Sequence, residues 1–252
     1  MMKKILKLLV LLLLFAGVVA YIFYALFNKP KTAETDVCKE ISLKVIENPR
    51  AYFINEKNIE ELLKKNGLNP VDKRMSEVNL DKMEEAIKKC IYVDSVECYK
   101  SGNGTVCVVA KQRTPVMYIL PDSTTGYYID EKGDVIENTN YASNVLVATG
   151  DITKEYARTR LVDFGNFLLQ DSFWDNQIVQ LNVTKSRGKD QVVELIPRVG
   201  EGVIYLGKTD GFEKKLKRMK VFYTKAMPSI GWDKYSAFNH EYPDQIVCTK
   251  KR

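Results

Sequence analysis

Residues 92–113, YVDSVECYKSGNGTVCVVAKQR, decide the fold of the first folded part of this chain. Two runs in which apolar and polar residues alternate flank the glycine-rich residues 101–104, a pattern typical of a β-hairpin. Thr114-Pro115 ends the second run, and proline suits a domain junction because it has no amide hydrogen to donate to a strand ladder. The stretch therefore predicts a hairpin that closes a domain at residue 115.

The turn of this hairpin leaves two registers open. A two-residue turn at Gly102-Asn103 pairs Cys98 with Cys107 where side chains approach closely enough for a disulfide. A turn at Asn103-Gly104 is the stronger type I′ sequence and pairs Cys98 with Val109. The first register matches apolar residues better, so we expect either a Cys98–Cys107 disulfide or two small buried side chains.

Two amphipathic helices are predicted upstream of the hairpin, after a strand with the sequence ISLKVI at residues 41–46. Asn55 and Asn79 are the expected N-caps, and Gly67 is expected to end the first helix in a left-handed conformation. The resulting order β-α-α-β-β over residues 40–115 predicts a small α+β domain. Its helices would cover one face of a three-stranded sheet.

An apolar stretch precedes this domain. Residues 8–27, LLVLLLLFAGVVAYIFYALF, contain neither charge nor proline. About 20 such residues cross a hydrocarbon core ~30 Å thick as a helix, so Leu8 and Phe27 mark the expected ends of a transmembrane anchor. The basic head, residues 1–7, is expected in the cytoplasm. The linker, residues 28–39, and all later residues are expected on the outer side of the cytoplasmic membrane.

A cleaved signal peptide is the alternative interpretation of the same stretch. Its apolar core is usually about 7–15 residues long, and this run is longer. The small residues near Ala20 form a poor cleavage site, and cutting there would leave residues 21–27 exposed. These features favour an uncleaved anchor.

Composition excludes several classes of function. The chain of 252 residues has a formal net charge of +6, but residues 1–31 contain five lysines and no acidic residue. The remaining residues are thus almost neutral and offer no electrostatic footprint for nucleic acid. Five cysteines, none in a CxxC pair, and the single histidine His240 do not support a zinc site. We expect no metal, no cofactor and no small-molecule substrate.

Residues 116–252 are expected to form a mainly antiparallel β-rich domain with two helices. The helices are predicted over about residues 153–170 and 212–227, the first capped by Asp151 or Thr153. The second carries a basic cluster that either contacts anionic lipid or a partner, or forms an ordinary solvated face: Lys214, Lys215, Lys217, Arg218 and Lys220. The strands are expected at residues 116–120, 127–129, 145–147, 178–183, 192–196 and 203–205.

The C-terminal stretch is the most informative for function. Residues 235–239 read as a strand, residues 240–244 interrupt it, and residues 245–249 resume it. A last strand can lie at a sheet edge, where unpaired backbone groups invite a strand from another chain. An ordinary closing strand is the alternative.

Several of these segments resemble the FtsQ/DivIB cell-division proteins. Gln112-Arg113-Thr114-Pro115-Val116 is similar to the E-R-x-P-V junction that follows the POTRA domain of that family, with glutamine in place of glutamate. Asp130 and Gly133 lie in a run similar to the family's hydrophobic-D-x-x-G-x-hydrophobic hairpin. The stretch from Phe238 to Val247 is similar to the family's final I-D-L-R-Y…Q-I-V segment, although Asn239 and Glu241 depart from it.

The resemblance implies a membrane-anchored POTRA-like domain followed by a β-domain at the division septum. It implies FtsB- and FtsL-like partners, with an FtsB strand added at the C-terminal edge, and a link to septal peptidoglycan synthesis. The partner-binding residues that it implies are Phe238, Tyr242, Gln245, Ile246 and Val247. From the residues alone, Arg113, Asp130 and Gly133 are expected to be structural.

No catalytic motif is evident in the sequence. It contains no G-x-S-x-G, no phosphate-binding loop and no H-E-x-x-H, so we expect a non-enzymatic protein. Two alternatives remain. A POTRA-bearing secretion or outer-membrane assembly factor would need a long run of barrel strands after the POTRA units. A membrane-anchored hydrolase would need His240 in a cleft beside a nucleophile.

Overall fold

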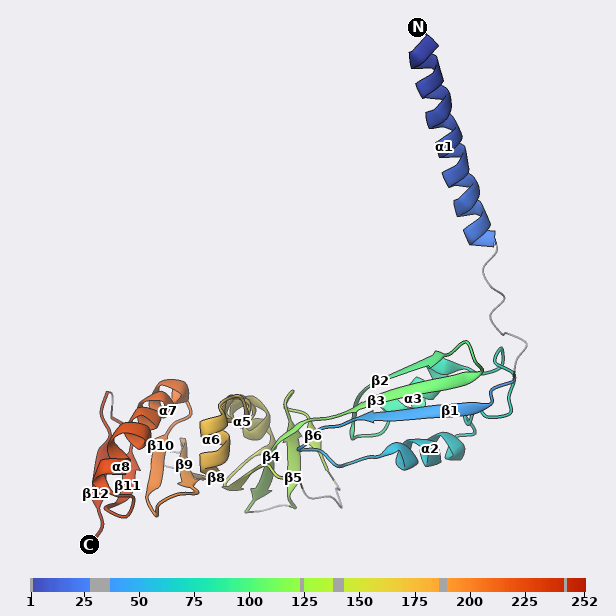
Figure 1. Ribbon diagram of the computed structural model, residues 1–252. Coiled ribbons are helices and arrows are strands. Elements are labelled where there is room, and N and C mark those ends of the chain that lie inside the picture. The colour runs from blue at the N-terminus through green and yellow to red at the C-terminus, as the bar shows by residue number, and fades with distance from the viewer. Residues whose placement is uncertain (1, 28–36, 123–124, 138–142, 186–189, 243) are drawn as a thin grey trace. The chain divides into compact units, whose positions relative to one another are not determined.

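The computed structural model describes residues 2–27, 37–122, 125–137, 143–185, 190–242 and 244–252 (Figure 1). Contacts divide the chain into two compact units. The first unit takes Met1–Lys44, Lys57–Ile87 and Val96–Val109. The second takes Val45–Glu56, Lys88–Ser95 and Ala110–Arg252.

Helix α1, Met2–Phe27, covers the apolar stretch near the start of the chain. Its described side chains, at positions 7 and 12–24, are exposed. Within the described part of the chain, no helix combines the length and the apolar character that crossing a membrane requires. The side chains of Leu8 and Phe27 lie outside the described residues, so the anchor stays a prediction.

The predicted order β-α-α-β-β is confirmed. Its strands form a three-stranded sheet in the order β1-β3-β2. The strands are β1 (Glu40–Ile46), β2 (Val93–Lys100) and β3 (Thr105–Gln112), and the helices are α2 (Glu56–Lys65) and α3 (Leu80–Lys88).

Both helices begin where the N-cap residues predict, and the first ends where Gly67 predicts. Helix α2 begins directly after Asn55, and Gly67, with φ of +68°, follows its end. At the start of α3, the backbone N–H of Lys82 donates to Asn79 Oδ1 at 2.9 Å. The apolar side of each helix is buried at the expected positions: Ile59 and Leu63 in α2, and Met83 and Ile87 in α3.

The β2–β3 hairpin has a register that neither predicted turn produces. The backbone N–H of Ser101 donates to the Thr105 carbonyl at 2.8 Å, and the N–H of Gly104 donates to the Ser101 carbonyl at 3.4 Å. Gly104 has φ of +84°. This is a three-residue loop with a left-handed glycine at the bulge, a common hairpin connection.

The observed register corrects the expected Cys98–Cys107 disulfide. Counting back from the Ser101–Thr105 pair sets Tyr99 opposite Cys107. Cys98 is one residue along the strand, so its side chain points to the other face of the sheet, where it is buried. All five cysteines lie in the described residues, and none of them forms a disulfide.

The second unit is built on a nine-stranded sheet with the order β12-β11-β10-β9-β8-β7-β4-β5-β6. Most of its strands coincide with the predicted apolar runs within a few residues. The strands are β4 (Pro115–Pro121), β5 (Tyr127–Asp130), β6 (Val135–Ile136), β7 (Leu146–Gly150), β8 (Ile178–Lys185), β9 (Gln191–Pro197), β10 (Val203–Gly207), β11 (Tyr235–Asn239) and β12 (Val247–Lys250).

The sheet is mixed, with five antiparallel and three parallel pairings. Parallel neighbours need a long crossover, and helices provide it between β7 and β8 and between β10 and β11. Sequence patterns predict two helices here, and the first crossover also contains a short one, α6. The first crossover holds α4 (Lys154–Tyr156), the π-helical η1 (Ala157–Leu161), α5 (Val162–Gln170) and α6 (Ser172–Gln177), and the second holds α7 (Phe212–Val221), η2 (Phe222–Ala226) and α8 (Met227–Ile230).

One row of apolar residues crosses the sheet from β4 to β12. Each member is the cross-strand partner of the next, so all of them lie on the same face. The first six are at most 1% exposed, and the last, on the edge strand, is half-buried. The row consists of Ile119, Ala148, Leu181, Leu195, Ile204, Phe238 and Cys248.

Thr153 caps the first crossover helix, since its Oγ1 accepts from the N–H of Tyr156 at 3.1 Å.

Helices cover this face of the sheet, because Phe164 of α5 and Leu216 of α7 belong to the same core cluster as the row. The opposite face of the sheet carries polar side chains at its centre. There Gln180 Nε2 donates to Thr149 Oγ1 at 3.1 Å. The sheet thus has one apolar and one partly polar face.

The hairpin register predicts the redox state of the cysteines. Denatured without reductant, the full-length chain is expected to react with five equivalents of a maleimide, because all five cysteines are thiols. Mass spectrometry of the labelled chain measures this number. Two fewer labels, with the Cys98 and Cys107 peptides found joined, would contradict the three-residue loop.

Candidate functional site

Strand β12 is the terminal strand of the nine-stranded sheet. It pairs antiparallel with β11, with Asn239 opposite Val247 and Phe238 opposite Cys248. On its other side, no strand of the described residues follows it. A terminal strand presents a row of unpaired backbone N–H and C=O groups, which can pair with a strand from another chain.

Few side chains hold β12 on the sheet. Val247 is 42% exposed, and Thr249 and Lys250 are exposed as well. Only Cys248 in the strand and Ile246 just before it pack, partly buried, against the core cluster. The strand is therefore defined mainly by its backbone pairing with β11.

The predicted partner-binding residues divide into two groups. Tyr242 is 50% exposed and Gln245 and Val247 are exposed, so all three are accessible beside the edge. Ile246 is half-buried. Phe238 is 1% exposed in the interior strand β11, and it supports the edge from the core through ring contacts with Phe222, Tyr223 and Tyr235.

His240 follows β11 and is 1% exposed. Its Nε2 lies 3.2 Å from Met219 Sδ on α7, and its Nδ1 has no hydrogen-bond partner among the described residues. Burial, with Arg218 and Lys215 nearby, lowers the pKa of His240 to about 4. The neutral ring is packed in the core, which does not match the cleft and adjacent nucleophile that a hydrolase would need.

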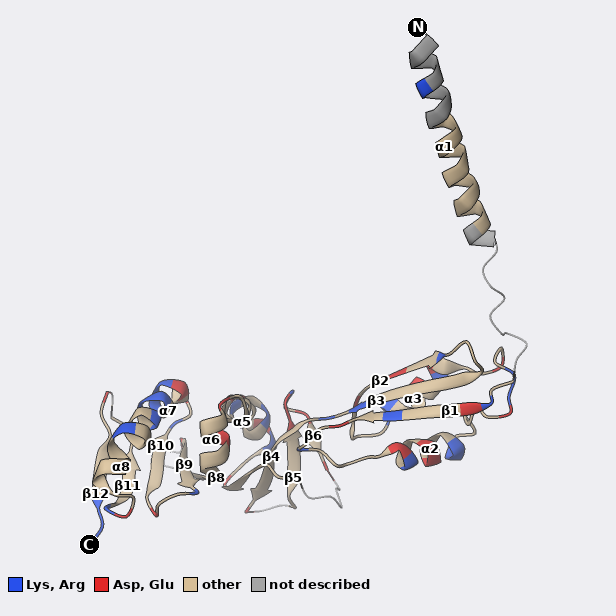
Figure 2. Ribbon diagram, in the orientation of Figure 1, with Lys and Arg blue, Asp and Glu red and all other residues tan. Residues whose placement is uncertain are grey.

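Figure 2 shows the basic residues of α7 in blue. Several of them are engaged in contacts within the chain. Lys215 Nζ donates to the carbonyls of Leu206 and Lys208, both at 2.8 Å. Lys220 Nζ forms an ion pair with Asp171 at 2.7 Å. Such contacts leave fewer free cations on this helix than its sequence indicates.

Arg218 connects the same helix to the C-terminal edge. One of its guanidinium nitrogens donates to the Gln245 carbonyl at 3.1 Å, and another lies 3.6 Å from the Asp244 carboxylate. The sequence pattern places Arg218 in the basic cluster and does not reveal this role. A contact between residues 27 positions apart has no local sequence signal.

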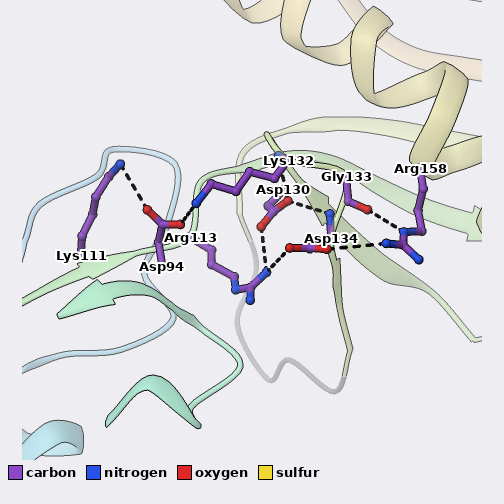
Figure 3. A network of polar contacts seen from close by, with 8 residues as sticks. All are labelled: Asp94, Lys111, Arg113, Asp130, Lys132, Gly133, Asp134 and Arg158. Atoms are coloured by element: carbon purple, nitrogen blue, oxygen red, sulfur yellow. Dashed lines mark hydrogen bonds and ion pairs between the residues drawn. The ribbon is translucent and has the colours of Figure 1, made fainter. Parts of the chain in front are cut away.

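A buried carboxylate organises the β5–β6 hairpin at the other end of the sheet (Figure 3). Asp130 is 1% exposed. Its Oδ1 accepts from the backbone N–H groups of Lys132 and Asp134 at 2.9 and 2.8 Å, and its Oδ2 accepts from Arg113 at 2.9 Å. One carboxylate oxygen of Asp130 thus closes the turn, and the other neutralises the Arg113 guanidinium.

The network extends on both sides of this carboxylate (Figure 3). Lys132 forms an ion pair with Asp94. On the other side, Arg158 Nε donates to the Gly133 carbonyl at 3.0 Å. Gly133 has φ of +81°, and a Cβ there would lie 2.9 Å from the Arg158 carbonyl, so both the turn and the close approach of η1 require glycine. These contacts fix the β5–β6 turn in place, which is a structural role.

In the part of the chain that the structure describes, no group of His, Cys, Asp and Glu side chains is arranged to hold a metal ion.

Residues 114–249 match the family model described as FtsQ/DivIB, C-terminal related, and residues 36–111 match a POTRA-like domain. This chain belongs to the FtsQ/DivIB family. A search of curated proteins found no match. The FtsQ/DivIB family is a family of non-enzymatic scaffold proteins.

The structure explains the glutamine in the FtsQ/DivIB-like junction motif. Gln112 is 4% exposed, and its Oε1 accepts from the backbone N–H groups of Phe53 and Ile54 at 2.9 and 3.2 Å. These bonds need an acceptor oxygen, which both an amide and a carboxylate supply. Glutamine fulfils this requirement without burying a charge.

Asp130→Ala is expected to reduce the free energy of unfolding by about 3–5 kcal/mol, because it leaves Arg113 and two backbone N–H groups without their acceptor. Urea denaturation followed by circular dichroism measures this loss. Asp134→Ala is the matched control. That carboxylate is 48% exposed, so its removal is expected to cost no more than about 1 kcal/mol. Equal losses in the two variants would contradict the role of Asp130.

His240 predicts a loss of stability in mild acid. In the unfolded chain its pKa returns to about 6.5, so the unfolded state binds the proton first as pH falls. Stability is then fully present above pH ~6.5 and decreases, by about 3 kcal/mol in total, as pH falls toward 4. His240→Leu removes the contribution of this histidine to the pH dependence of the free energy of unfolding. Urea denaturation at pH 7, 5.5 and 4.5 should show a shallower pH dependence for the variant, and equal slopes would contradict the prediction.

Proposed function

We propose that this FtsQ/DivIB-family protein is a single-span membrane scaffold of the bacterial division machinery that binds partner proteins by strand addition at β12. The observation that carries this proposal is the terminal position of β12 in the sheet. Backbone hydrogen bonds to the added strand supply the affinity, and side chains at alternating positions supply the specificity. The work is non-covalent.

The partners that we propose are FtsB- and FtsL-like division proteins. Support comes from the family and from the accessible residues around the edge. Tyr242 and Val247 offer half-exposed aromatic and aliphatic side chains, and Gln245 offers an exposed polar side chain. Exposed aromatic and aliphatic side chains beside an unpaired strand suit a protein partner. Through these partners the protein would be linked to septal peptidoglycan synthesis.

We further propose that residues 8–27 anchor the chain in the cytoplasmic membrane at the septum, with residues 1–7 in the cytoplasm and the bulk on the outer side. The support is the uncharged apolar stretch and its basic head. An anchor confines the two folded units to the membrane surface. This raises their effective concentration for partners that are anchored in the same membrane.

Val247→Glu tests the binding edge. Val247 is on the face of β12 opposite the apolar row, so a charge there leaves the core intact but lies next to the side chains of any strand paired with β12. Capture of the outer-side segment of the FtsB-like protein by the full-length chain is expected to weaken at least tenfold, about 1.4 kcal/mol. Ile246 is less suitable, because it packs partly against the core.

Val199→Glu is the matched control for this variant. Val199 lies between β9 and β10 and is 43% exposed, almost the same as Val247. Val199→Glu adds the same charge at an exposed valine outside the edge strand and is expected to leave capture unchanged. Equal capture by all three proteins would reject β12 as the site. Loss of the circular dichroism signal in Val247→Glu alone would show instead that Val247 is needed for folding.

A further inference from the structure

The backbone immediately before the edge strand is tied to helix α7 by one side chain. Arg218 is 27% exposed, and its guanidinium donates to the Gln245 carbonyl at 3.1 Å. This carbonyl is therefore turned toward α7. An arginine hydrogen bond to a carbonyl is charge-assisted and stronger than a neutral one.

The residue before this contact has an unusual backbone conformation. Asp244 has φ of +61° in the left-handed region, which non-glycine residues seldom adopt. Its side chain is fully exposed, so packing does not impose this conformation. The carboxylate lies 3.6 Å from the Arg218 guanidinium. Arg218 thus contacts both Asp244 and Gln245 and holds the two residues next to α7.

The strand that follows has little apolar packing to hold it. It pairs with β11 over four residue pairs, interrupted by a register shift between Tyr235 and Ala237. Its apolar packing is limited to Cys248 and the neighbouring Ile246, each half-buried. Short edge segments with little apolar burial open with small free energies. Fixing the backbone at the start of such a strand therefore affects the whole strand.

We propose that Arg218 is a positioning residue that holds β12 ready for the partner strand; this rests on the proposed binding at β12. An edge that is already ordered spares the partner the entropic cost of ordering it. Because the Gln245 carbonyl is turned toward α7, backbone pairing with the added strand begins beyond Gln245. Arg218 thereby keeps β12 ordered before binding and sets the residue at which pairing with the added strand begins.

Amide hydrogen exchange of the full-length chain without any partner tests the positioning itself. In Arg218→Met, which keeps an apolar stem of similar length, those amides of Val247–Lys250 that are bonded to β11 are expected to exchange about tenfold faster. The amides of β8, in the middle of the sheet, should be unaffected. Lys217→Met is the matched control, because Lys217 is exposed on the same helix, directly before Arg218. Unchanged exchange in Arg218→Met would overturn the proposal.

Capture of the outer-side segment of the FtsB-like protein tests the consequence. Arg218→Met is expected to bind about tenfold more weakly, mainly through slower association, while Lys217→Met binds like the unmodified chain. Faster exchange with unchanged capture would overturn the positioning role but leave strand addition at β12 intact. Failure of the unmodified chain to bind would reject the proposed function itself, while the exchange result would still report on Arg218.

Asp244→Asn separates the two contacts of Arg218. Asparagine tolerates the left-handed conformation and keeps the Gln245 hydrogen bond, but it removes the charge. An exposed ion pair contributes little, so exchange and capture are expected to stay within twofold of the unmodified chain. A change as large as that of Arg218→Met would show that the ion pair, and not the carbonyl contact, positions the edge.

Discussion

The second unit depends on burying one continuous row of apolar side chains across its sheet. From Ile119 in β4 to Cys248 in β12, each member of the row is paired with the next on a neighbouring strand. A slip of one residue in any strand would turn its apolar members to the opposite face. The opposite face carries polar groups such as Gln180 and Asn182. Burial of the row therefore sets the register of seven strands at once.

The same constraint explains where the helices and the binding edge lie. The apolar row needs a cover, and the two parallel crossovers place helices over it. After the second crossover, β11 joins the sheet beside β10, and the last strand can pair only beyond it. The row ends there with the half-buried Cys248. An accessible edge at the C terminus follows from the topology, and α7, which covers the row, also supplies Arg218 to that edge.

Much of the fold is readable in the sequence because its signals are local. Asn79 caps α3 through a side chain three residues from its donor, and Gly67 ends α2 because glycine adopts positive φ without strain. Apolar alternation locates most strands, and the order and spacing of several short motifs indicate the FtsQ/DivIB family. The predicted hairpin turn at residues 101–104 is wrong because two- and three-residue loops share the same glycine-rich sequence, and the sequence does not distinguish their hydrogen bonds.

The sequence by itself determined the order of elements, the caps and the apolar stripes, since each depends on residues close together along the chain. It also indicated the family, through the order and spacing of motifs that are each local. Only the tertiary structure decided that the large sheet is mixed, that Phe238 is core, and that Cys98 and Cys107 lie on opposite faces. It also decided that Arg218 reaches Gln245. These features depend on which distant segments become neighbours, and that is fixed by collective burial of the apolar row and not by any local pattern.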